Sequence, residues 1–148
     1  MAAARRTTPS APPTRLVRVE HVMGTTVSID VRLPLVPRAA VDEAIAWFHD
    51  VDRRFSPYRE TSEVTRVGMG LLPFQAASPD VRAMFTLAEE LRDRTGGFFD
   101  PRSFRADGRP DPTGVVKGWS VDEAIAGLRL AGARNLQVVA GGDLVAAG

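Results

Sequence analysis

The residues best placed to do chemistry lie between Asp111 and Asp122, a stretch that holds the single lysine of the chain. All eighteen other basic side chains are arginines, so Lys117 stands out as a compact point charge. It is followed by Gly118 and is expected just ahead of a helix, where a cation suits a phosphate or pyrophosphate. Composition alone leaves open that Lys117 is an ordinary surface residue. The acidic and glycine neighbours favour a functional role.

Four aspartates stand at expected element junctions beside Gly or Pro or in a helix start. Carboxylates at such places accept hydrogen bonds from ribose or ring N–H donors, or face a divalent cation. They also form turns and helix caps for purely local reasons. Capping is the favoured interpretation for Asp122, and a functional role is favoured for Asp111. The four residues are Asp100, Asp111, Asp122 and Asp143.

Other familiar catalytic sets are missing from the sequence, which has no phosphate-binding GxGxxG or Walker pattern and no cysteine. His21 and His49 are best interpreted as ordinary strand and helix residues. Tyr58, in a polar loop, either stacks on a flat heterocycle or covers the core with its hydroxyl in water. Gly141-Gly142 either lets backbone approach a pyrophosphate or forms a hairpin turn.

Hydrophobic periodicity predicts the elements that position these residues. Alternation of apolar and polar side chains predicts two paired strands, and apolar stripes predict helices, with Asp50, Asp52, Arg53 and Arg54 of the first helix mostly in solvent. Ser78 is expected to cap one helix, and Ser120 with Glu123 to form the capping box of another. The expected elements are strands at 16–22 and 25–33, helices at 38–53, 62–67 and 79–95, an extended segment at 98–101, a loop at 102–113, a helix at 120–130, and strands at 136–140 and 144–146.

This order predicts an α+β fold with a largely antiparallel sheet and packed helices. The length of 148 residues predicts one domain, at 15–148, after a disordered arm at 1–14. A net charge of +1 argues against nucleic acid as the partner. No membrane span or signal peptide is expected, so the predicted location is cytoplasmic.

Five segments in a defined order resemble the FAD:protein FMN transferases, a flavin transferase family. The likeness extends over roughly residues 19 to 148. The segments are Met23-Gly24-Thr25, Ser56-Pro57-Tyr58 with Ser62-Glu63, Gly96 to Pro101, Asp111 to Gly118 with Asp122, and Asn135 to Asp143.

The resemblance implies an enzyme that binds FAD and Mg²⁺, breaks the pyrophosphate, and attaches FMN to a Thr or Ser hydroxyl of an acceptor protein. It implies a metal contact through the backbone carbonyl of Gly114, and it assigns no catalytic side chain. The flavin contacts that it implies are Met23, Tyr58, Phe98, Phe99, Asp100, Asp111 and Lys117.

This sequence also departs from the family pattern. In the family the chain continues past the Gly-Gly-Asp turn with a His motif and an Asp/Thr cluster that binds the metal, and these have no counterpart here. The loop between Asp100 and Asp111 is short, and no lipid-anchor cysteine is present. We therefore expect the N-terminal portion of the family domain, incomplete for catalysis. The alternatives are a non-catalytic flavin- or nucleotide-binding module and a degenerate remnant.

Overall fold

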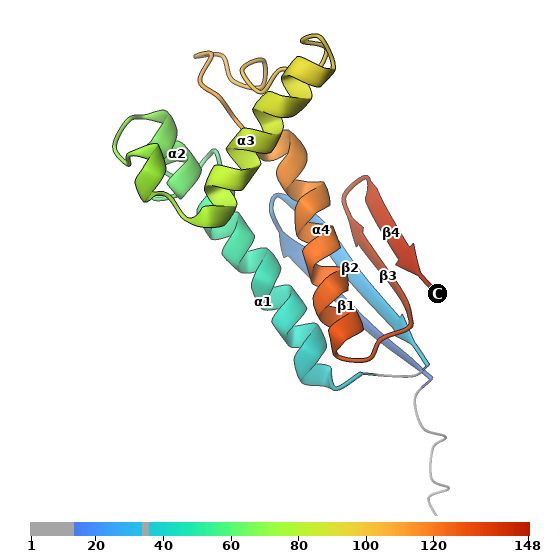
Figure 1. Ribbon diagram of the computed structural model, residues 1–148. Coiled ribbons are helices and arrows are strands. Elements are labelled where there is room, and N and C mark those ends of the chain that lie inside the picture. The colour runs from blue at the N-terminus through green and yellow to red at the C-terminus, as the bar shows by residue number, and fades with distance from the viewer. Residues whose placement is uncertain (1–13, 34–35) are drawn as a thin grey trace, which may run out of the picture.

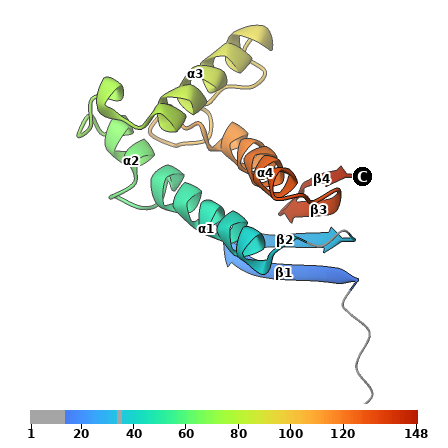
Figure 2. The ribbon, with the colours of Figure 1, turned by 60° about the horizontal axis from the view of Figure 1, so that its bottom comes forward.

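The computed structural model describes residues 14–33 and 36–148 and has two layers, a four-stranded sheet and helices on one of its faces (Figures 1 and 2). The predicted disordered arm lies outside the described residues, apart from Thr14. The α+β class is confirmed. The elements are β1 (Arg15–Val22), β2 (Thr25–Arg32), α1 (Arg38–Phe55), α2 (Glu63–Gly68), the 3-10 turn η1 (Phe74–Ala76), α3 (Pro79–Arg94), α4 (Thr113–Leu130), β3 (Asn135–Ala140) and β4 (Asp143–Ala147).

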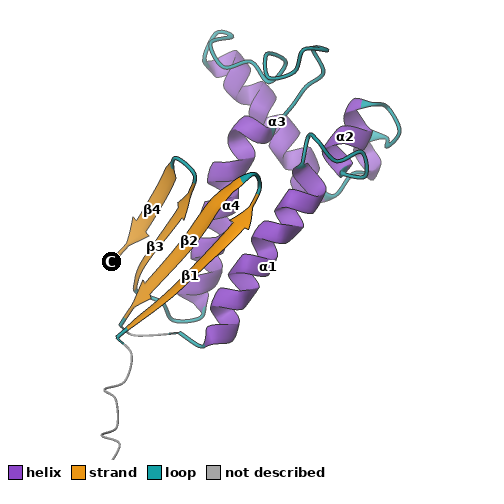
Figure 3. Cartoon of the chain, turned by 180° about the vertical axis from the view of Figure 1, so that it is seen from behind, coloured by secondary structure: helices purple, strands orange, loops and turns teal. Residues whose placement is uncertain are grey.

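The sheet is antiparallel throughout, in the order β1-β2-β3-β4. Val27, Ile29 and Val31 of β2 are fully buried because alternate side chains of a strand point to the same face. The predicted hairpins are confirmed, each joined by a two-residue turn. Since neighbouring strands run in opposite directions, both turns lie at the same end of the sheet (Figure 3).

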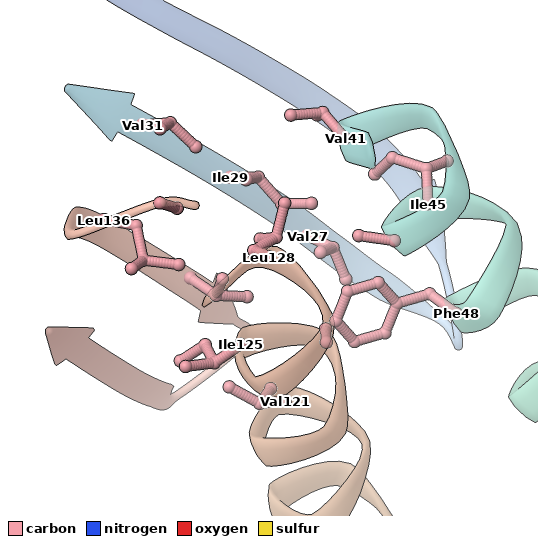
Figure 4. Close-up of a cluster of buried hydrophobic side chains, with 14 of the residues drawn as sticks. Val27, Ile29, Val31, Val41, Ile45, Phe48, Val121, Ile125, Leu128 and Leu136 are labelled. Carbon is pink, nitrogen blue, oxygen red and sulfur yellow. The ribbon is translucent and has the colours of Figure 1, made fainter. Parts of the chain in front are cut away.

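The core lies between this sheet and the helices α1 and α4, which pack against each other (Figure 4). Phe48 of α1 is fully buried, and Leu128 of α4 is 1% exposed. The C-terminus of α1 and the N-terminus of α4 both reach the end of the sheet that carries the two hairpin turns (Figure 1). A second apolar cluster continues beyond that end, between α1, α3 and the start of α4.

Helix α4 begins at Thr113, seven residues before the predicted start at Ser120, so Lys117 lies inside the helix and not ahead of it. Ser120 is fully buried and donates its hydroxyl to the carbonyl of Lys117, 2.7 Å away. The helix instead starts where the Asp111 carboxylate accepts the N–H of Thr113 at 2.9 Å. A local capping pattern in mid-helix therefore misplaced the boundary.

Three further local predictions were wrong. Residues 98–101 form bends and turns instead of an extended segment. Ser78 precedes α3, but its hydroxyl makes no capping bond; it accepts a hydrogen bond from Arg54, 3.3 Å away. Arg54 itself is buried, with 8% exposure, instead of facing solvent.

None of the helices in the described residues is both long and apolar enough to cross a membrane.

Candidate functional site

A pocket of about 340 Å³ opens at the end of the sheet that carries the two hairpin turns. Three separate parts of the chain form it: the β1–β2 turn, the end of α1 with the loop that follows, and the first turns of α4. Their meeting follows from the antiparallel topology, which brings these termini to one end of the molecule. The lining residues are Met23, Gly24, Val51, Asp52, Phe55, Ser56, Pro57, Tyr58, Thr113, Val116 and Lys117.

Met23 is held in an unusual backbone conformation at the pocket. Its φ of 58° is the only positive value among the non-glycine residues that the structure describes. A large side chain rarely adopts this region outside tight turns, and such positions often mark functional sites. The side chain packs against both hydrophobic clusters, which compensates for the strain and fixes the turn beside the pocket.

Tyr58 exposes 94% of its surface while lining the pocket. The loop beneath it is well braced: Ser62 donates its hydroxyl to the carbonyl of Ser56 at 2.6 Å, and Thr65 donates to the same carbonyl at 3.2 Å. A ring left in water on a rigid loop is free to stack on a flat heterocycle.

Lys117 contributes a half-buried cation to the pocket. Within the described ranges, no carboxylate lies within ion-pair distance of its ammonium, and the ammonium donates no hydrogen bond. The carboxylate of Asp52, which also lines the pocket, is paired with Arg59 at 2.8 Å. The pocket therefore contains an ammonium group without an ion-pair partner among the described residues, and a carboxylate whose charge is balanced by Arg59.

Asp111 is 3% exposed and does not line the pocket. Its N–H donates to the carbonyl of Pro101 at 3.0 Å, which closes the base of the loop between them. Its carboxylate caps the first turn of α4 through Thr113, a residue of the pocket wall. In this structure Asp111 positions the helix that carries Lys117, and its predicted flavin contact stays a prediction.

The predicted contacts at Phe98, Phe99 and Asp100 lie in the loop after α3, outside the pocket lining. Phe98 is 97% exposed, and Phe99 packs against Phe104 with ring centroids 5.6 Å apart. Asp100 accepts the N–H of Arg102 at 3.0 Å. Of the seven predicted flavin contacts, the structure thus brings Met23, Tyr58 and Lys117 together in one pocket.

Gly114, the predicted metal contact, is the second residue of α4. A helical carbonyl at that position points along the axis toward the N–H four residues later. The described residues contain no group of three or more His, Cys, Asp or Glu side chains arranged to hold a metal ion. The metal contact at Gly114 therefore stays a prediction.

Sequence reasoning missed several pocket residues. Asp52 was interpreted only as a helix residue, and Phe55 and Thr113 were placed in loops. Their only sequence signal is proximity to the ends of α1 and α4, and it becomes informative only once the two ends are known to meet.

Comparison with known proteins identifies a family and solved structures that share this fold. The ApbE family matches residues 23–106, which is more than half of the chain. Among solved structures, the flavin transferase ApbE from Vibrio cholerae superimposes with a TM-score of 0.77 and 21% identity, over 93% of this chain and 60% of that one. The flavinyl transferase ApbE from Pseudomonas stutzeri, in its apo form, gives 0.74 and 20%, over 90% and 58%.

A mutant of the Vibrio cholerae protein gives a TM-score of 0.79 at 19% identity, over 90% of this chain and 63% of that one. No curated protein matches the sequence. The chain spans about three fifths of the length of these solved relatives. The match to the family, together with the shared fold, shows that the chain belongs to the ApbE family.

Proposed function

We propose that this chain is a single-domain portion, residues 15–148, of an FAD:protein FMN transferase and that its pocket binds the flavin nucleotide. The observation that best supports this is the meeting of Met23, Tyr58 and Lys117 from three distant segments. An exposed aromatic ring, an apolar flexible side chain and an unpaired cation are the chemistry that a flat ring carrying phosphates requires.

The proposed binding mode assigns one task to each side chain. The ring of Tyr58 stacks on the planar part of the ligand, and Met23 packs against its edge. The ammonium of Lys117 neutralises negative charge on the diphosphate. Asp111 holds the start of α4 so that Lys117 keeps its place.

In the proposed reaction the hydroxyl oxygen of an acceptor Thr or Ser forms a bond to the phosphorus of the FMN half of FAD. The bond between that phosphorus and the bridging oxygen breaks, and AMP leaves with the bonding electron pair. The hydroxyl proton is released to solvent or to a base. Lys117 lowers the barrier by stabilising the charge that grows on the phosphate oxygens.

Magnesium is the part of the family reaction that the described residues do not support, since they gather no set of side-chain ligands. No step above depends on it. We expect FAD binding by this chain to be measurable without Mg²⁺, with at most a modest gain on adding it.

A second candidate function is flavin or nucleotide binding without turnover. Two observations favour this second function: the pocket is formed, and the described ranges hold no group of three or more side-chain metal ligands. The two functions share the binding step and differ only in whether FMN reaches an acceptor.

Binding is tested by titrating FAD fluorescence with the chain and with the variant Lys117→Ala. We expect binding to weaken by about 1–3 kcal/mol, the range for hydrogen bonds to charged groups. Arg129→Ala, an exposed cation in the last turn of the same helix, is the control and should leave binding unchanged. Equal affinity in all three proteins would remove the phosphate role of Lys117, and no FAD binding at all would overturn the proposal.

Transfer is tested by incubating the chain with FAD, Mg²⁺ and a protein carrying the target Thr, followed by detection of covalent flavin fluorescence on a denaturing gel. We expect FAD to bind and little or no FMN to be transferred by this chain alone. Strong labelling would show that the chain is competent and would contradict its expected incompleteness.

A further inference from the structure

A second hollow, of about 440 Å³, shares a wall with the pocket that we propose for the flavin. The wall is the loop between α1 and α2: residues 56–58 line the pocket, and Glu60 and Thr61 line the hollow. The rest of the hollow is formed by the C-terminal end of α2 and the turn after it, through Arg66, Met69 and Leu71. We call this second site the α2 hollow.

Two large apolar side chains of the α2 hollow are exposed, Met69 by 50% and Leu71 by 62%. The backbone that carries them is nonetheless fixed, because α2 ends in a Schellman motif. The N–H of Leu71 donates to the carbonyl of Arg66 at 2.8 Å. The N–H of Gly70, whose φ is 71°, donates to the carbonyl of Val67 at 3.0 Å. The residue at the position of Leu71 commonly packs back on the helix in this motif, so its exposure here leaves apolar surface for a partner.

Arg66 and Glu60 bring charges of opposite sign to the α2 hollow. Both side chains are exposed, and neither forms an ion pair or a side-chain hydrogen bond with the described residues. Their neighbour Arg59, in contrast, pairs with Asp52 at 2.8 Å. A guanidinium fork suits a carboxylate, and a carboxylate accepts the N–H groups of an extended backbone. The α2 hollow thus combines apolar surface with a free donor and a free acceptor, which suits an extended polypeptide.

We propose that the α2 hollow docks the acceptor protein through an extended segment next to the Thr or Ser that receives FMN. An apolar side chain of the segment packs on Met69 and Leu71, where the thioether of Met69 adapts to its shape. An acidic side chain of the segment pairs with Arg66, and Glu60 accepts a backbone N–H.

The shared loop favours the acceptor over a second copy of the chain as the occupant. A segment held in the α2 hollow has only this loop to cross before its hydroxyl reaches a ligand in the pocket. The inference rests on the proposed function, because only a flavin nucleotide in that pocket gives the docked hydroxyl a reaction. It adds a sequence preference: the acceptor carries an apolar and an acidic residue at a constant spacing from the modified Thr or Ser.

The test selects short displayed peptides, each with a single central Thr, on the unsubstituted chain in the presence of FAD. We expect the bound sequences to share an apolar and an acidic residue at a constant spacing from the Thr. One selected peptide is then labelled and titrated by fluorescence anisotropy. Leu71→Ser should weaken its binding about tenfold, because apolar surface is no longer buried. Leu144→Ser, which changes a similarly exposed leucine of β4, is the control and should bind normally.

The charge pairing is tested with Arg66→Glu, which should also weaken binding of the selected peptide about tenfold. Exchanging the acidic residue of the peptide for Lys should restore binding to Arg66→Glu and weaken binding to the unsubstituted chain. Arg129→Glu, at the matching place in the last turn of α4, is the control and should have no effect. A loss of binding that the Lys peptide does not reverse would contradict the pairing.

FAD affinity in the same variants separates this inference from the proposed function. Leu71→Ser and Arg66→Glu should bind FAD normally, and a loss of FAD binding would place the α2 hollow in the ligand site and overturn the docking role. If the selected peptides shared no pattern, or bound Leu71→Ser and Leu144→Ser equally, docking would be refuted while FAD binding stood. If peptide binding depended on Leu71 but FAD did not bind at all, the proposed function would fail and a peptide site would remain.

Size-exclusion chromatography distinguishes the remaining occupant. We expect the unsubstituted chain and Leu71→Ser to elute alike. A dimer of the unsubstituted chain that Leu71→Ser abolished would make a second copy the occupant and would overturn the proposal.

Discussion

At the scale of single residues, glycines in α4 have two different roles. A Cβ at Gly114 would lie 3.0 Å from the ring of Phe99 and 3.1 Å from that of Phe104, whereas one at Gly127 would meet nothing within 4 Å. Gly114 therefore lets the aromatic residues of the 98–112 loop dock on the first turn of the helix. Gly127 is simply a poor helix former on an open surface.

This contrast gives opposite predictions for the same substitution. Gly127→Ala should stabilise the protein by up to about 1 kcal/mol through helix propensity. Gly114→Ala should be less stable than Gly127→Ala by about 1–3 kcal/mol, because overpacking against two rings outweighs that gain. Urea unfolding of the two variants measures the difference. Equal stabilisation by the two substitutions would mean that the 98–112 loop shifts to accommodate the new methyl group without loss of stability.

Tyr58 gives a second prediction at this scale. Because its ring is exposed and its loop is braced from below, removing the ring should affect ligand binding more than folding. Tyr58→Ala should weaken FAD binding by about 0.5–1.5 kcal/mol, the range for aromatic pairing. Tyr58→Phe keeps the ring and should bind nearly as well. A loss of binding in both variants would point to the hydroxyl instead of stacking.

At the scale of elements, Arg54 links α1 to the start of α3. Its guanidinium donates to Asp50 on its own helix at 2.7 Å and to Asp80 of α3 at 3.0 Å. The same group lies 5.8 Å from the ring centroid of Trp47 and 5.3 Å from that of Phe55, within cation–π range. This buried group fixes the end of α1 that forms one wall of the pocket.

We predict that Arg54→Met lowers the free energy of unfolding by about 1–3 kcal/mol, since hydrogen bonds to charged groups are lost while the apolar stem is kept. Arg53→Met is the matched control. Arg53 pairs with Asp50 from an exposed position, so its removal should cost less than about 1 kcal/mol. Chemical denaturation of both variants is the measurement, and equal losses would contradict a special role for the buried arginine.

At the scale of the whole molecule, several carboxyl groups titrate below their usual range. The hydrogen bond from Arg15 lowers the pKa of Asp30, and the hydrogen bonds from Arg109 lower that of Asp107. For Asp50, burial opposes ionisation, but the neighbouring guanidinium groups outweigh it and the pKa is still lowered. All three carboxylates are therefore more acidic in the folded chain than the ordinary value of 3.8.

A carboxyl group whose pKa is lowered by folding stabilises the folded state at any pH above its pKa in the unfolded chain. This stabilisation is lost as the pH falls through its pKa in the folded chain. We expect the thermal unfolding midpoint to be nearly constant between about pH 5 and 7 and to fall below about pH 4. Replacing Arg15 and Arg109 together by Gln should flatten the fall. A midpoint that rose on acidification would contradict this prediction.

Period-two alternation predicted β2 within one residue, because a strand with one buried face records that face in its own sequence. The two-residue turns were equally local. The start of α4 could not be predicted from its local sequence, because Gly114 and Gly118 weaken helix propensity and the Ser120–Glu123 pair has the pattern of a capping box. Packing of Val116 and Trp119 in the second apolar cluster holds those early turns in place.

By itself, the sequence determined the fold class, the two hairpins and the family resemblance, all of which depend on residue types at fixed spacing. Only the tertiary structure decided which predicted contacts share a pocket, that Arg54 is buried, and that Thr25 and Gly141 meet Lys117. The physical reason is that these relations join residues from 24 to 94 positions apart, and their distances are set by how the helix ends and strand turns come together at one end of the sheet.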